Sequence, residues 1–198
     1  MLKIEIEQLC AGYLRGEIKD AELVIRTCYE HFAKTRSLKK LSDDNWVALA
    51  RGKNDVRYYL NYCYSDGENY VAVDGHRMHV LKNVKYTPDA FYGKNRLREH
   101  VEAIYPDYKK VIPTDVEILG KIHEVSFING YYNDKKYVNI GGKVFCLKQY
   151  FDEAIAGFSN EAIISLGIND FSIKIESSEK LAVIMCVAIP DGEFIASM

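Results

Sequence analysis

The pattern of apolar and polar residues indicates an antiparallel sheet near the end of the chain. Phe171, Ile173 and Ile175 alternate with polar residues, which predicts a strand with one buried and one solvent-exposed face. Apolar runs bounded by turn residues precede and follow this strand. We therefore expect three consecutive strands here, at residues 162–168, 171–176 and 181–189.

A helix is expected directly before these three strands. Its apolar face follows helical spacing and consists of Leu147, Tyr150, Phe151, Ala154, Ile155 and Phe158. A shorter helix is expected earlier, through about Ala50, with Ser42 or Asp43 as its N-cap. Because strands follow both helices, the chain carries a weak structural repeat. The predicted fold class is α+β, an antiparallel sheet with helices on one face.

Turn signals separate the strands that follow the first of these helices. We expect strands at residues 55–64, 70–73 and 78–81. The dipeptides Asp66-Gly67 and Asp74-Gly75 are typical of tight turns. They are expected to reverse the chain between these strands.

A less regular stretch joins the two parts of the repeat. Residues 82–113 hold three of the four prolines and are expected to form a connector with turns. Two further strands are then expected, at residues 116–128 and 131–140. The dipeptide Asn129-Gly130 between them is a strong hairpin signal.

The chain is expected to have three parts. Residues 1–40 read as a helical N-terminal extension, although Leu2, Ile4 and Ile6 alternate and leave a short opening strand as an alternative. Residues 41–190 form the α+β domain. Residues 191–198 are a C-terminal tail that is apolar enough to dock on the domain.

The composition is that of an ordinary globular protein. Of its 198 residues, 48% are hydrophobic and 27% are charged, which excludes a disordered chain. Lys and Arg number 26 and Asp and Glu 28, for a net charge of −2. A tight binder of nucleic-acid phosphates usually has a basic surplus, which is missing here, although basic residues can still gather on one face.

The cysteines and apolar runs indicate a soluble protein of a reducing compartment. No two cysteines have the C-x-x-C spacing of a zinc or redox motif. No apolar run approaches the length of a membrane span, and the N-terminus has no apolar signal segment. We expect a cytoplasmic protein without membrane contact, whose cysteines are core residues: Cys10, Cys28, Cys63, Cys146 and Cys186.

No enzyme motif stands out in the sequence. His76 and His79 have an H-x-x-H spacing but follow a strand and a turn, so no metal site is expected. There is no G-x-S-x-G nucleophile motif and no phosphate-binding glycine loop. We expect no catalytic residues and no cofactor. The 15 tyrosines are explained by a half-exposed sheet or by a stacking or peptide-binding surface.

Three motifs, in order, resemble signature stretches of the bacterial DNA polymerase III β sliding clamp family. Residues 55–61 read D-V-R-Y-Y-L-N, and residues 71–78 read V-A-V-D-G-H-R-M. Residues 105–113 read Y-P-D-Y-K-K-V-I-P. The end of the chain, L-A-V-I-M-C-V at residues 181–187, is similar to the end of the last clamp domain. The resemblance implies a DNA-clamp-like fold over residues 41–190.

The resemblance also implies a hydrophobic pocket for short Q-L-x-L-F-like peptides of DNA polymerase and other replication proteins. Apolar anchors and a few polar groups are typical of peptide recognition. Carried over residue by residue, the pocket consists of Leu60, Val73, Gly75, His76, Arg77, Met78, Pro106, Lys110, Val111, Val183, Met185 and Val187. His76 and Arg77 are expected to be donors at its rim. A fold in which these residues are only turn and core positions is the alternative.

A second set of residues matches a clamp loop that faces DNA. The resemblance implies weak, non-specific contacts of this loop with double-stranded DNA, because cations meet phosphates without reading sequence and tyrosines stack on bases. The set consists of Arg51, Lys53, Arg57, Tyr58 and Tyr59. A solvated basic loop is the alternative for these positions.

Some features depart from the family pattern. Clamp subunits are longer and have several similar domains, and the second and third motifs lie closer together here. Val73 replaces a threonine, and Met185-Cys186-Val187 replaces M-P-M. The chain resembles a compact, phage-encoded relative. It is expected to be a sliding clamp that encircles DNA as a homo-oligomer, or alternatively an adaptor that binds clamp-binding peptides without forming a ring. A purely structural protein is a third possibility.

Overall fold

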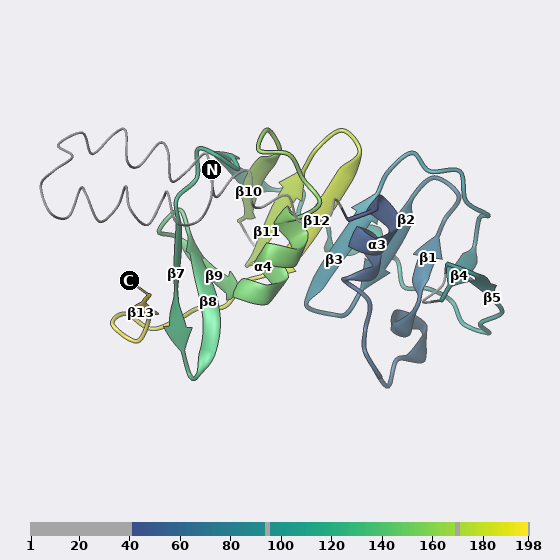
Figure 1. Cartoon of the computed structure of the whole chain (residues 1–198), viewed down its shortest axis with the longest axis horizontal. Helices are drawn as coiled ribbons and strands as arrows, with labels where there is room; N and C mark the ends of the chain where they lie inside the picture. The colour runs from purple at the N-terminus through teal and green to yellow at the C-terminus, as the bar shows by residue number, and fades with distance from the viewer. Residues whose placement is uncertain (1–40, 94–95, 169–170, 198) are drawn as a thin grey trace, which may run out of the picture. The chain divides into compact units, whose positions relative to one another are not determined.

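The computed structural model describes residues 41–93, 96–168 and 171–197 (Figure 1). The helices and the alternative strand expected within residues 1–40 lie outside these residues. The largest element of the described chain is a nine-stranded antiparallel sheet in the order β5-β4-β1-β2-β3-β12-β11-β10-β6. Its strands are β1 (Cys63–Ser65), β2 (Tyr70–Val73), β3 (Arg77–Leu81), β4 (Ala90–Tyr92), β5 (Arg98–Glu99), β6 (Val116–Lys121), β10 (Ile163–Gly167), β11 (Ser172–Glu176) and β12 (Lys180–Met185).

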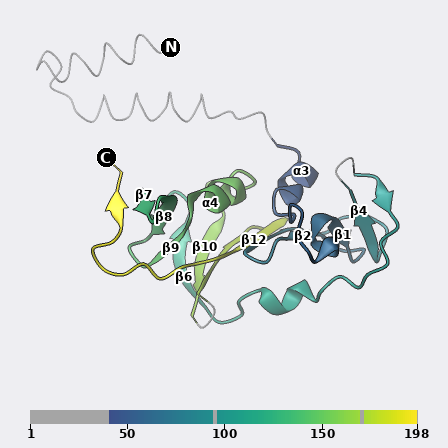
Figure 2. The same cartoon turned by 90° about the horizontal axis from the view of Figure 1, so that it is seen from below.

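Two helices cover one face of this sheet. Helix α3 (Asp43–Ala48) packs on β2 and β3, and helix α4 (Lys148–Ile155) packs on β12 and on a second sheet. Figure 2 shows both helices on the same side of the long sheet. Trp46 and Phe151 point from the two helices into one core, together with the strand residues Ala72, Ile164, Ile173, Ile175, Ala182 and Ile184. The predicted fold class, α+β with helices on one face, is confirmed.

The connector between the two parts covers the opposite face. It contains the 3₁₀ helix η2 (Tyr108–Val111), which lies across the sheet from α3 and α4 (Figure 2). Tyr105 and Tyr108 of this connector are buried in a second core. The other members of that core are Leu60, Val71, Met78, Val80, Phe91, Leu181 and Val183. The sheet is thus apolar on both faces at its centre, which explains the continuous apolar run of β12.

The structural repeat expected from the sequence is present. One half consists of α3 followed by β1, β2 and β3, and the other of α4 followed by β10, β11 and β12. The two halves meet at the centre of the sheet, where β3 and β12 are antiparallel neighbours. Met78 lies opposite Val183 in this pair. One continuous ladder of hydrogen bonds therefore joins the halves.

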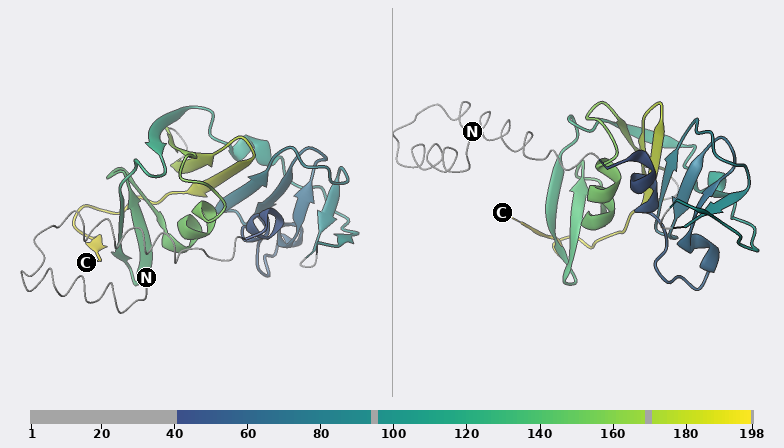
Figure 3. Two further views of the ribbon diagram at one scale, coloured as in Figure 1. Left: turned by 45° about the horizontal axis from the view of Figure 1, so that its top comes forward. Right: turned by 45° about the vertical axis from the view of Figure 1, so that its right-hand side comes forward.

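A second sheet lies beside one end of the long sheet, with three strands in green and the C-terminal strand in yellow in Figure 3. Its strand order is β13-β7-β8-β9, with β7 (Phe127–Tyr132), β8 (Lys135–Ile140), β9 (Val144–Leu147) and β13 (Ile195–Ala196). The predicted hairpin turn at Asn129-Gly130 is wrong, because β7 runs straight through these residues. The chain reverses instead at Asn133 and Asp134, with φ angles of 45° and 60°. These two residue types tolerate the left-handed region that such a turn needs.

The strand predicted at residues 55–64 is also largely wrong. Tyr58–Asn61 form the 3₁₀ helix η1, and only β1 is extended. The Asn61 side chain accepts a hydrogen bond from the Asp55 amide at 3.0 Å and donates one to the Asp55 carbonyl at 3.1 Å. This side-chain bridge satisfies the backbone locally and closes a loop in place of a strand.

The C-terminal tail docks on the second sheet. Ile195 pairs with Tyr131 of β7, and the Phe194 ring lies 4.8 Å from that of Phe145. A side chain at Gly130 would collide with Phe194 and with the Ile195 carbonyl. Gly130 is therefore required for the close approach of the tail and does not form a turn.

Of the five cysteines, the three in the described residues are buried free thiols: Cys63, Cys146 and Cys186. Burial raises the pKa of Cys63 to about 11 and that of Cys186 to about 12. Within the described ranges, no helix has the length and apolar character needed to cross a membrane.

Candidate functional site

A cavity of about 260 Å³ lies where the two halves of the sheet meet. We refer to it as the junction cavity. It is lined by Val73, Gly75, His76, Arg77, Met78, Lys110, Val111, Ser172, Val183 and Met185. It brings together nine of the twelve residues that the resemblance assigned to a peptide pocket, from three segments that are far apart in the sequence.

The floor of the junction cavity is apolar and rigid. Met78 of β3 lies directly opposite both Val73 of β2 and Val183 of β12. Met78 is 1% exposed and Val183 is 5% exposed. Cross-strand neighbours on one face have their Cβ atoms about 5 Å apart, so the three side chains form one continuous apolar surface.

One rim of the cavity is the turn between β2 and β3. The Asp74 carboxylate accepts hydrogen bonds from the amides of His76 at 2.9 Å and Arg77 at 3.0 Å, which fixes the turn. Gly75 has a φ of +89°, a conformation that favours glycine. The Arg57 guanidinium lies against Gly75, at 2.9 Å from the position of a Cβ. A side chain here would therefore displace Arg57.

The opposite rim exposes apolar side chains. Val111 of η2 is 54% exposed and Met185 at the end of β12 is 52% exposed. Lys110 is beside Val111, and its side chain is largely exposed. A flexible methionine at the mouth of an apolar cavity adapts to ligands of different shape. This rim therefore presents apolar surface with a positive charge at its edge.

Arg77 does not fit the expectation of a donor at the rim. Its guanidinium is buried and donates hydrogen bonds to Asp74 at 3.0 Å, to the Leu49 carbonyl at 2.6 Å and to Glu153. It also lies over the Tyr150 ring, 4.4 Å from the centroid. These contacts hold the turn against both helices, so Arg77 is a buried structural residue and not the exposed rim donor that was expected.

Three of the predicted pocket residues do not line the cavity. Leu60 is a core residue of η1, Pro106 is exposed on the connector, and Val187 forms a bridge with Phe145. Ser172 lines the cavity but was not predicted. Ser172 lies opposite Met185 in the β11–β12 pair. The alternation of buried and exposed residues along these two strands could have predicted that Ser172 and Met185 share a face.

The residues predicted to face DNA are mostly engaged with their own surroundings. Arg57 forms a two-bonded pair with Asp55, at 2.8 and 3.0 Å, and this hydrogen bonding lowers the pKa of Asp55 to about 2. The Tyr58 hydroxyl donates to the Glu102 carbonyl at 2.7 Å. Arg51 donates to the Ala48 carbonyl, at 3.3 Å. Lys53 is exposed and Tyr59 is half-buried.

The two histidines of the H-x-x-H spacing lie in different environments. His76 is exposed at the cavity, whereas His79 is buried and stacks on Trp46 with ring centroids 4.5 Å apart. His79 Nδ1 lies 2.8 Å from the Trp46 carbonyl, and burial lowers the pKa of His79 to about 4. In the described part of the chain, no three His, Cys, Asp or Glu side chains gather as metal ligands.

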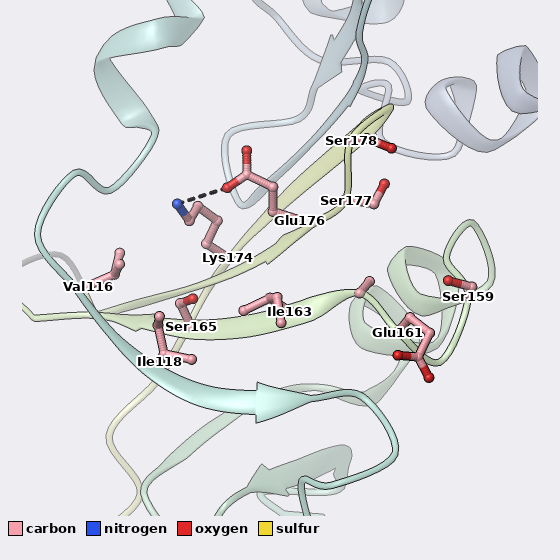
Figure 4. Close-up of a pocket in the computed structure, with 11 residues that line it drawn as sticks. Val116, Ile118, Ser159, Glu161, Ile163, Ser165, Lys174, Glu176, Ser177 and Ser178 are labelled. Carbon is pink, nitrogen blue, oxygen red and sulfur yellow. Dashed lines mark ion pairs between the residues drawn. The ribbon is translucent and has the colours of Figure 1, made fainter.

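A second and larger cavity, of about 570 Å³, opens on the same sheet face (Figure 4). We refer to it as the serine cavity, because four serines contribute to its lining. Figure 4 shows its residues on β6, β10, β11 and the two turns beside them. The lining consists of Val116, Ile118, Ser159, Glu161, Ala162, Ile163, Ser165, Lys174, Glu176, Ser177 and Ser178.

Comparisons with known proteins identify the fold. A sliding clamp of Pseudomonas aeruginosa superposes with a TM-score of 0.55 and 16% identity, over 77% of this chain and 65% of that chain. The sliding clamp of Bacillus subtilis superposes with a TM-score of 0.52 and 13% identity, over 78% of this chain and 63% of that chain. The DNA polymerase III β subunit of Thermotoga maritima superposes with a TM-score of 0.51 and 13% identity, over 78% of this chain and 64% of that chain. No family model and no curated protein matches the sequence.

The chain therefore has the sliding-clamp fold, and the resemblance to bacterial DNA polymerase III β clamps is confirmed at the level of the fold. The matched region spans less than two thirds of these clamp chains.

Proposed function

We propose that this protein is a clamp-type processivity factor of DNA replication that tethers replication proteins by binding their short apolar peptides in the junction cavity. The observation that carries the proposal is the convergence of the β2–β3 turn, η2 and β12 on one cavity. The protein is then a non-enzymatic cytoplasmic accessory protein, as clamps are.

The physical properties of the cavity support peptide binding. Its floor of Val73, Met78 and Val183 is built on paired strands and is fixed before a ligand arrives, so little ordering is required on binding. Val111 and Met185 leave apolar surface exposed at the mouth. An exposed apolar patch beside a cavity is typical of an interaction site.

The test is the affinity of the full chain for a fluorescein-labelled peptide Gln-Leu-Ser-Leu-Phe, measured by fluorescence anisotropy. Met185→Asp and Val111→Asp place a carboxylate at the mouth without disturbing the buried floor. We expect each to weaken binding by about tenfold or more, the effect of losing an apolar anchor contact.

The matched control is Ile128→Asp, since Ile128 is exposed to a similar degree on β7 and lines neither cavity. It should bind the peptide as the wild type does. Absence of binding by the wild type, or equal affinities for wild type and both mouth variants, contradicts the proposed function.

An adaptor that binds the same peptides without encircling DNA is the second candidate. Docking of β13 covers the β7 edge of the second sheet, whereas β5 and β6 remain the edge strands of the long sheet, so the fold is compatible with both candidates. Light scattering at several concentrations separates the two. A closed homo-oligomer retained on circular double-stranded DNA supports the processivity factor, and a concentration-independent monomer supports the adaptor.

A further inference from the structure

The serine cavity adjoins the junction cavity on the same sheet face. Lys174 of the serine cavity lies directly opposite Val183, which is in the floor of the junction cavity. Two positions earlier on β11, Ser172 of the junction cavity lies opposite Met185. Because alternate strand residues share a face, Ser172 and Lys174 point to the same side of the sheet. A ligand that leaves the junction cavity along β11 therefore meets Lys174 first.

Two lysines surround one carboxylate on the β11 side of the serine cavity. The Lys174 ammonium lies 3.0 Å from Oε2 of Glu176, and the Lys82 ammonium lies 2.6 Å from Oε1 of the same carboxylate. Two cations thus share one anion. The Lys174 side chain is only 18% exposed, so solvent screens its charge less than that of a surface lysine. Figure 4 shows the Lys174–Glu176 pair above the strand face.

The opposite end of the serine cavity is not positive. Glu161 lies there and pairs with Lys121 at 2.6 Å. The turn serines Ser177 and Ser178 line the side between β11 and β12. Lys110, on the rim of the junction cavity, is 80% exposed at its side chain and is 3.6 Å from Asp107. Lys174 is thus the cation of the serine cavity that lies next to the floor of the junction cavity.

We propose that the serine cavity is a second subsite for the same ligand, which receives an acidic segment adjoining the apolar anchors of the bound peptide. This rests on the proposed function of the junction cavity. The partner is a peptide with apolar anchors followed or preceded by aspartate or glutamate. A carboxylate of that segment accepts a hydrogen bond from Lys174, while Glu176 keeps its pair with Lys82. Charge-assisted hydrogen bonds of this kind are stronger than neutral ones.

The experiment compares three fluorescein-labelled peptides on the full chain: Gln-Leu-Ser-Leu-Phe, the same peptide with two aspartates at its N-terminus, and the same with two at its C-terminus. We expect one acidic peptide to bind about three- to tenfold more tightly than the plain peptide at low salt, and the gain to shrink as salt is added. The Lys174→Gln variant should lose this gain and keep the affinity for the plain peptide.

The Glu176→Gln variant is expected to have the opposite effect on the affinity for the acidic peptide. It frees Lys174 and Lys82 from their shared carboxylate, so the gain from the acidic segment should increase. A merely structural role of the Lys174–Glu176 pair would move both variants in the same direction. Lys135→Gln on β8, outside both cavities, is the matched control and should behave as the wild type.

The outcomes distinguish this proposal from the proposed function. If no peptide binds, the proposed function fails, and this inference with it. If the plain peptide binds but neither acidic peptide gains affinity, or Lys174→Gln keeps the gain, the second subsite alone is overturned. If Ile118→Asp changes the mass in solution while all peptide affinities stay unchanged, the serine cavity belongs to a contact between copies of the chain, and the proposal is likewise overturned.

Discussion

Arg77 and Glu153 form an ion pair that ties the first half of the long sheet to the helix of the second half. Arg77 begins β3, and Glu153 lies on α4. The Arg77 side chain is 3% exposed and that of Glu153 is 24% exposed. The pair therefore sits at the edge of the core, directly behind the wall of the junction cavity, and its loss affects both stability and binding.

Arg77→Ala should lower the free energy of unfolding by about 3 kcal/mol, because it leaves the carboxylates of Asp74 and Glu153 without their buried partner. Urea denaturation followed by circular dichroism measures this. Glu153→Gln should cost less, about 1 kcal/mol, because its amide oxygen still accepts from Arg77. An Arg77→Ala variant as stable as the wild type would show that the pair contributes nothing.

Gly75→Ala should weaken peptide binding. It places a side chain at a φ of +89° and against the Arg57 guanidinium, which must then leave its position on the turn. Gly142→Ala is a matched control, because Gly142 has a φ of +73° and no atom near its Cβ position. Both variants should lose about 1 kcal/mol of stability from backbone strain. Only Gly75→Ala should lose affinity for the labelled peptide, and equal losses of affinity would refute the role of the turn.

His79 should make the protein less stable in mild acid. The pKa of His79 is lowered by burial from 6.5 to about 4, so the unfolded chain binds a proton that the folded chain excludes. Stability should therefore fall as the pH drops from about 6.5 to about 4, by on the order of 3 kcal/mol. Urea denaturation at several pH values measures the slope. His79→Gln should flatten it over this window, and an unchanged slope would assign the acid sensitivity to other groups.

Gly130→Val should release the C-terminal tail from β7. The new side chain would occupy the space of Phe194 and the Ile195 carbonyl. The amide of Ser197, which donates to the Asn129 carbonyl at 2.8 Å, should then exchange rapidly in hydrogen–deuterium exchange. The central strands should keep their protection. A tail that stays protected in Gly130→Val would mean that docking does not depend on the close approach at Gly130.

The elements that the sequence predicted well are those whose periodicity agrees with their tertiary surroundings. Strand β11 and helix α4 each bury one face, so alternation and helical spacing predict them directly. The Asn129-Gly130 signal failed because a segment more than 60 residues later, at Phe194 and Ile195, decides the conformation there. The turn preference of two adjacent residues cannot predict a contact with such a distant segment.

The candidate site was predictable in its position and not in its details. The motif at residues 71–78 forms a strand, a turn and a second strand, and it carries half of the junction cavity with it. The role of Arg77 was missed because Glu153 is 76 positions away, and spacing does not show such a partner. The serine cavity was missed because it is formed by alternate residues of three strands whose order only the sheet reveals.

The pairing of β3 with β12 has a consequence for the folding of the chain during its synthesis. Met78 and Val183 are about one hundred positions apart, and contacts of such long range form late and slowly in folding. During synthesis, β12 emerges after every other strand of the long sheet. Until β12 has been translated, the floor of the junction cavity therefore lacks Val183 and consists of Val73 and Met78 alone. Under the proposed function, a chain that ends before β12 is therefore expected not to bind the peptides.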